Sequence, residues 1–179
     1  MSNPQPTGEC LPQIARNSVA EHFGLEPTGR ETEPNEYLAK AAGVFVTIRK
    51  DNGELRGCRG TIQPQFENVV EETRRLALSS ALEDTRFEPV RVHELDGLSY
   101  EVSVLHPPEP AASLADFDPT RYGIIVRDST GRRALMLPNV EGLDTVAKQY
   151  SATCRKGGIN PNGEVDLERF QVDKFAEAN

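Results

Sequence analysis

Two turn signals, each set between extended apolar runs, constrain the fold of this 179-residue chain more than any other feature. Asp51-Asn52-Gly53 separates VFVTIR (44–49) from LRGCRGTI (55–62). Asp128-Ser129-Thr130-Gly131 separates residues 122–127 from residues 133–137. Asn, Asp and Gly tolerate positive φ, so both patterns predict β-hairpins. Two hairpins exclude a regular βαβ series and favour antiparallel sheets.

Periodicity assigns the rest of the chain. Apolar residues recur at helical spacing over Glu9–Phe23, 66–82 and 142–157, which predicts three helices. Strict alternation over Leu98–Leu105 predicts a strand, and Val165–Phe175 is predicted to be the last strand. We therefore expect an α+β fold with a mainly antiparallel sheet flanked by helices.

Composition excludes several function classes. The net charge of −8 argues against nucleic acid and anionic membranes as partners, because both need a basic footprint. No apolar run approaches the roughly 18 residues of a membrane span. The first residues, MSNPQPTGEC, lack an apolar signal core. The Pro-rich stretch 107–119 is interpreted either as an internal boundary or as a surface loop.

Three cysteines, Cys10, Cys58 and Cys154, are too few and too widely spaced for a disulfide framework. Their number favours a reducing, cytoplasmic location. No CxxC or HxxxH spacing predicts a metal site, and no cofactor-binding loop is recognised. Cys154 falls on the apolar face of a predicted helix and is expected to be structural.

The segment Leu55-Arg56-Gly57-Cys58-Arg59-Gly60 allows three interpretations. Residues two apart in a strand share a face, so Arg56 is expected beside Cys58, where a guanidinium favours the reactive thiolate. Alternatively, Gly57 and Gly60 expose backbone N–H groups that bind an anion. In the third interpretation Cys58 only packs, as free cysteines often do.

Three further residues are weighed in the same way. Glu101 and Ser103 share a face of the predicted strand whose other face is apolar. If that face lines a cleft, Glu101 is a candidate general base and Ser103 a ligand-binding hydroxyl; otherwise both are ordinary surface residues. Arg86 is a candidate anion contact, although an arginine in a turn more often pairs locally.

LRGCRG resembles the LRGCIG signature of the AMMECR domain family. Other stretches agree with this family in the same order: FVTIRKDNGE, LEDTRFEPV, YEVSVLHPPEP, RYGIIV, ALMLPNVEGLDT and CRKGGI. Together they span about residues 10–175. The chain is most similar to short prokaryotic members of the AmmeMemoRadiSam system.

The resemblance implies a single AMMECR-like domain over residues 1–179, in two lobes, with a smaller lobe inserted within the chain. A cleft between the lobes would hold Cys58. Carried over residue by residue, it implies Cys58 and Glu101 as catalytic candidates. The binding candidates are Arg56, Gly57, Gly60, Arg86 and Ser103.

The resemblance leaves the function open between two hypotheses. The first is a cytosolic enzyme or enzyme component that uses Cys58 in a modification pathway with Memo-like and radical S-adenosylmethionine proteins. The alternative is a non-catalytic adaptor that presents the same cleft to a small anion, a peptide or a partner protein. Arg59 departs from the family pattern, which has an apolar residue after the cysteine.

Overall fold

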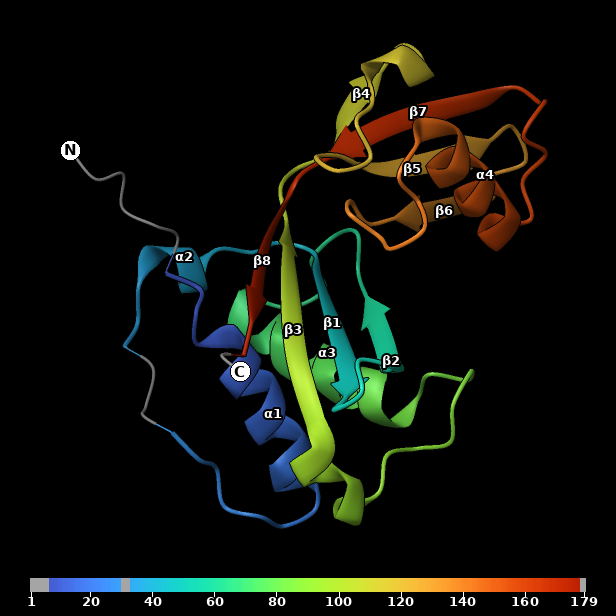
Figure 1. Ribbon diagram of the computed structural model, residues 1–179. Helices are drawn as coiled ribbons and strands as arrows, with labels where there is room; N and C mark the ends of the chain where they lie inside the picture. The colour runs from blue at the N-terminus through green and yellow to red at the C-terminus, as the bar shows by residue number, and fades with distance from the viewer. Residues whose placement is uncertain (1–6, 30–32, 178–179) are drawn as a thin grey trace. The chain divides into compact units, whose positions relative to one another are not determined.

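The chain forms two compact units in the computed structural model, which describes residues 7–29 and 33–177. The first unit combines the residues up to Val104 with those from Asp173 onward, and the second is Leu105–Val172. Each unit has a four-stranded sheet and its own hydrophobic core. The predicted α+β class is confirmed (Figure 1).

The sheet of the first unit has the strand order β2 (Leu55–Gly60), β1 (Val44–Lys50), β3 (Leu98–Leu105) and β8 (Val172–Ala176). β1 pairs antiparallel with both β2 and β3. The turn between β1 and β2 places Gly53 at φ +84°, a conformation that favours glycine, so the first predicted hairpin is confirmed.

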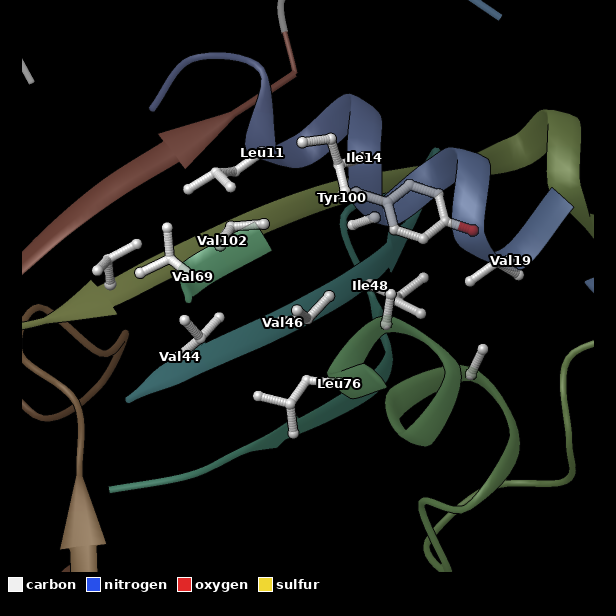
Figure 2. Close-up of a cluster of buried hydrophobic side chains, with 14 of the residues drawn as sticks. Leu11, Ile14, Val19, Val44, Val46, Ile48, Val69, Leu76, Tyr100 and Val102 are labelled. Atoms are coloured by element: carbon white, nitrogen blue, oxygen red, sulfur yellow. The ribbon is translucent and has the colours of Figure 1, made fainter. Parts of the chain in front are cut away.

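Strand alternation directs one face of this sheet toward α1 (Leu11–His22) and α3 (Val69–Leu82). The short helix α2 (Glu36–Ala39) adds Leu38 to the same core. Figure 2 shows side chains of β1 and β3 packed with those of the two long helices. The labelled members are Leu11, Ile14, Val19, Val44, Val46, Ile48, Val69, Leu76, Tyr100 and Val102. Because this face is apolar and buried, polar strand residues are left for the opposite face.

The sheet of the second unit has the order β4 (Glu109–Ala111), β7 (Val165–Phe170), β5 (Gly123–Asp128) and β6 (Arg133–Met136). The helix α4 (Val146–Gly157) supplies Cys154 to its core, which also holds Ile124, Val126, Ala134 and Ile159. Cys154 is 1% exposed, so its predicted structural position is confirmed.

All three predicted helices begin later than periodicity predicts: α1 at Leu11, and α3 and α4 at the residues that follow a capping side chain. α3 begins at Val69 because the side chain of Asn68 caps it, accepting a hydrogen bond from the N–H of Glu71. Phe66 therefore lies outside the helix. α4 begins at Val146, where Thr145 is the cap.

The predicted last strand, Val165–Phe175, is wrong as a single element. It is divided at Gln171 into β7 and β8, which belong to different sheets. The Pro-rich stretch contains β4, an edge strand in which Pro110 is tolerated. Sequence patterns also missed α2 and the short 3-10 helices at Val92–Gly97 and Leu114–Asp116.

Candidate functional site

The candidate site lies on the face of the first sheet that turns away from α1 and α3. In the strand register, Thr47 of β1 is directly opposite Cys58 of β2 and Glu101 of β3. Directly opposed residues point to the same face, with Cβ atoms about 5 Å apart. We call this surface the Cys58 face; its polar residues include Thr47, Cys58, Glu101, Ser103 and Lys174, which bonds Glu101, and the register adds Arg49 and Ser99 in the next row.

The thiol of Cys58 contacts the hydroxyl of Thr47. Sγ and Oγ1 are 3.4 Å apart, and either atom can be the donor. Cys58 is half-buried, whereas Thr47 is buried. Because a hydroxyl both donates and accepts, Thr47 can serve a thiolate or a thiol.

An ion pair from the turn after α3 holds the backbone of Cys58. Asp84 Oδ2 accepts a hydrogen bond from the Cys58 N–H at 2.9 Å. The same carboxylate binds Arg86 through Nη2 at 2.7 Å and Nε at 3.0 Å. Arg86 Nη2 in turn donates to the carbonyl oxygen of Cys58 at 3.4 Å. Both outward-facing backbone groups of Cys58, on the edge strand β2, are thus engaged.

We call Asp84 and Arg86, which together bond the backbone of Cys58, the Asp84–Arg86 bracket. Arg86 dominates its electrostatics. Its guanidinium holds the pKa of Asp84 well below the usual range, and the Cys58 N–H acts in the same direction, while burial opposes both. The pKa of Arg86 is raised, chiefly by Asp84. Of the two interpretations of Arg86, an anion contact or local pairing, the structure shows local pairing with the carboxylate of Asp84.

Gly57 allows α3 to approach β2 closely. A Cβ on Gly57 would lie 2.1 Å from the carbonyl oxygen of Ser80. The hydroxyl of Ser80 accepts from the N–H of Arg59 and donates to the carbonyl of Val46, both at 2.9 Å. The hydroxyl thereby bridges β1 and β2. Gly57 serves helix packing in this structure, and the N–H after Cys58 is bonded within the chain.

Gly60 has a comparable packing role in the neighbouring row of the sheet. A Cβ on Gly60 would lie 2.2 Å from the ring of Phe45, which is directly opposite in the register. Ser103 is the other residue opposite Phe45 and is 4% exposed. The structure therefore brings Ser103 and Gly60 to the same face as Cys58.

Arg56 does not follow the expected strand alternation. The β1–β2 register shifts between Ile48 and Arg49, so that Gly57 and Leu55 face successive residues of β1 and Arg56 is the extra residue of a bulge. Its guanidinium binds Glu94 through Nε at 2.9 Å and Nη2 at 3.1 Å. These bonds also lower the pKa of Glu94.

Arg59, the departure from the family pattern, lies at the end of α3. Its Nη1 donates to the carbonyl oxygen of Glu83 at 2.9 Å. A cation is favourable at a helix C-terminus, where carbonyl groups are unpaired. This position accommodates the arginine without placing its charge on the Cys58 face.

Glu101 is paired with Lys174 of β8, with Oε1 and Nζ 3.1 Å apart. The side chain of Glu101 is 21% exposed and that of Lys174 is 51% exposed. Glu101 is two strands from Cys58, which corresponds to about 10 Å between their backbones. This distance is too long for a direct hydrogen bond between the Glu101 carboxylate and the thiol.

Sequence reasoning missed Thr47, Asp84 and Lys174. A hairpin centred between Asn52 and Gly53 pairs residue 47 with residue 58, so the sequence does indicate that Thr47 lies opposite Cys58. Asp84 and Lys174 approach the site only through the packing of α3 and β8, and no local pattern indicates that.

Within residues 7–29 and 33–177, no group of three His, Cys, Asp or Glu side chains is placed to hold a metal ion. A cavity of about 770 Å³ between α1, α2 and α3 contains no residue of the Cys58 face. Among the described residues, no helix is long and apolar enough to cross a membrane.

Together the fold and the site define an α+β protein with a free cysteine on one face of an antiparallel sheet. The AMMECR1 family matches residues 12–175, and the chain belongs to this family. The resemblance read from the sequence is confirmed.

Curated relatives and a solved structure are similar to this chain over almost its whole length. A Thermotoga maritima protein is 41% identical over 164 residues, which cover 91% of this chain and 92% of the relative. A Clostridium acetobutylicum protein is 39% identical over 172 residues, covering 93% of this chain but 36% of that longer relative. The crystal structure of an uncharacterised Pyrococcus horikoshii protein matches with a TM-score of 0.81 and 33% identity, covering 95% of this chain and 91% of that one.

Proposed function

We propose that this protein is a cysteine-dependent enzyme, or a component of one, in which Cys58 is the nucleophile. The observation that carries the proposal is the contact of 3.4 Å between Cys58 Sγ and Thr47 Oγ1. The thiolate is the reactive form of cysteine, and a hydroxyl that donates to it stabilises that form. The bracket formed by Asp84 and Arg86 fixes the backbone that carries the nucleophile.

The proposed step is attack of the Cys58 thiolate on an electrophilic carbon, such as an acyl carbon. A sulfur–carbon bond forms, the bond to the leaving group breaks, and the leaving group departs with its electron pair. The thiol proton is lost to water before the attack. Glu101, two strands away, then positions or deprotonates a group of the substrate that lies over Thr47.

We further propose a cytoplasmic location and a modification pathway with Memo-like and radical S-adenosylmethionine proteins as partners. The family resemblance supports these partners, and three free cysteines fit a reducing compartment. An adaptor for small anions is the weaker alternative, because the N–H groups of Cys58 and Arg59 are engaged by Asp84 and Ser80.

Covalent capture tests the proposal. The purified protein is incubated with the small-molecule fraction of a cell extract, and its intact mass is compared with that of Cys58→Ala. We expect a mass increase that depends on Cys58 and is removed by hydroxylamine, which cleaves thioesters. Compounds that bind equally to the wild type and to Cys58→Ala, without any adduct, would favour the adaptor.

A further inference from the structure

We infer that the Cys58 face accepts a substrate bearing a positively charged amine rather than an anion. This inference rests on the proposed function, because it names the substrate class of the same nucleophile. Three observations carry it: the engagement of the nearby arginines, the exposure of the Glu101 ion pair, and the distribution of charge between the two units.

The arginines of the signature segment and its bracket are all engaged within the chain. Arg56 binds Glu94 through two nitrogens, and Arg86 binds Asp84 in the same way. Arg59 donates to the carbonyl of Glu83. At the buried Arg56, an incoming anion would have to displace a carboxylate held by two nitrogens, and at Arg86 it would compete with Asp84 for the same guanidinium.

Glu101 is held more weakly. Its partner Lys174 is 51% exposed and makes a single contact of 3.1 Å with the carboxylate. Exposed lysine pairs of this kind contribute little, since the lysine loses side-chain entropy and water screens the charges. A substrate ammonium group can therefore replace Lys174 at Glu101 while the electrophilic carbon lies at Cys58.

The electrostatic field of the first unit also favours a cation over an anion. By sequence, this unit holds 19 acidic and 12 basic residues, whereas the second unit holds 9 acidic and 8 basic residues. Almost all of the net charge of −8 is thus carried by the unit that presents Cys58. Such a field raises the local concentration of cations and lowers that of anions.

Charged thiol reagents test this inference on the full-length protein. The rate of disulfide formation at Cys58 is followed by peptide mass spectrometry with three methanethiosulfonates: neutral methyl, cationic 2-aminoethyl and anionic 2-sulfonatoethyl. In each reaction the thiolate attacks the sulfur that carries the organic group. A new S–S bond forms, the bond to the sulfonyl sulfur breaks, and methanesulfinate leaves. The cation-to-anion rate ratio at Cys58 is divided by the ratio for free cysteine in the same buffer.

We expect a corrected ratio of about two- to fivefold at low ionic strength, decreasing as salt is added. Glu101→Gln should bring the ratio close to one, and Lys174→Gln should raise it by unmasking Glu101. Glu21→Gln is the matched control, because it removes one exposed carboxylate from α1, on the other side of the sheet. That control should leave most of the preference intact.

A corrected ratio of one or below in the wild type, with Cys58 reactive toward the methyl reagent, would overturn the inference and leave the proposed function standing. A ratio that Glu101→Gln does not change would also overturn it. A Cys58 that is inert toward all three reagents would overturn the proposed function, and the inference with it.

Discussion

The carboxylate of Asp84 and the backbone N–H of Cys58 are joined by a hydrogen bond of 2.9 Å. Cys58 lies on the edge strand of its sheet, so no further strand satisfies this N–H. The turn after α3 supplies the acceptor instead, and Arg86 locks that acceptor in place. The position of the proposed nucleophile therefore depends on residues that do not touch its sulfur.

Asp84→Asn should lower the free energy of unfolding by about 1–3 kcal/mol. The asparagine has one accepting oxygen, so it can replace Oδ2, which accepts from Cys58 and Arg86, or Oδ1, which accepts from Arg86, but not both. Its NH2 group then faces a donor, and the negative charge opposite Arg86 is lost. Urea unfolding measures this change. Glu88→Gln, an exposed substitution in the same turn, is the control and should stay within about 0.5 kcal/mol. If Asp84→Asn and Glu88→Gln were equally stable, the claim that the Asp84 carboxylate stabilises the fold through its bonds to Arg86 and Cys58 would be wrong.

The contribution of Asp84 should depend on pH in one direction. Its pKa is lowered on folding, so its stabilisation is complete above the ordinary carboxyl pKa of about 3.9 and is lost as the pH falls below that value. The difference in unfolding free energy between the wild type and Asp84→Asn should be constant from about pH 5 to 7 and shrink below about pH 4. A stability difference that grows as the pH falls below 4 would contradict a lowered pKa of Asp84 in the folded protein.

Gly57→Ala should destabilise the protein by about 2–3 kcal/mol, because the new methyl group meets the backbone carbonyl of Ser80. At Gly60 the atoms nearest to the new methyl group belong to the ring of Phe45, a side chain that can move, so the cost of Gly60→Ala should be smaller. Thermal unfolding of both variants measures the order. A less stable Gly60→Ala would show that the contact between α3 and β2 is not the constraint on Gly57.

Arg56→Met should separate stability from reactivity. The side chain of Arg56 is 8% exposed, and its loss leaves Glu94 unpaired, so we expect a loss of about 1–3 kcal/mol, moderated by the partial exposure of Glu94. The alkylation rate of Cys58 by iodoacetamide should stay within about twofold of the wild type, because this guanidinium is committed to Glu94. A rate reduced tenfold would restore the thiol-activating role expected from the sequence.

Local patterns predicted the elements of the sheet better than their contacts. The strand predicted over Leu98–Leu105 has the same bounds as β3, and its apolar residues Leu98, Tyr100, Val102 and Val104 are the ones buried in the helix-covered core. The other face is not simply exposed, because Ser103 and Leu105 are buried as well. The run Val165–Phe175 did not reveal its division at Gln171, since no glycine or proline marks the place where the chain leaves one sheet for another.

For the candidate site, too, the sequence predicted which residues are involved better than it predicted their contacts. The sequence predicted that Cys58, Glu101 and Ser103 are candidates, and the register brings them to one face. It also predicted Arg56 beside the thiol, but the bulge between β1 and β2 changes the alternation, and a bulge depends on cross-strand packing that single residues do not encode. The distant residue Asp84 reaches Cys58 only because α3 packs on β2.

The most direct test of the account is the rate at which iodoacetamide alkylates Cys58 at pH 7, in the wild type and in two variants of Thr47. Thr47→Val keeps the shape of the side chain and removes the hydroxyl, whereas Thr47→Ser keeps the hydroxyl. Because one hydrogen bond to the thiolate is worth about 1–1.5 kcal/mol, we predict a rate about five- to tenfold lower in Thr47→Val and close to wild type in Thr47→Ser. Cys154, buried in the other unit, serves as the unreactive reference. Equal rates in the wild type and Thr47→Val would contradict the claim that the Thr47 hydroxyl activates Cys58.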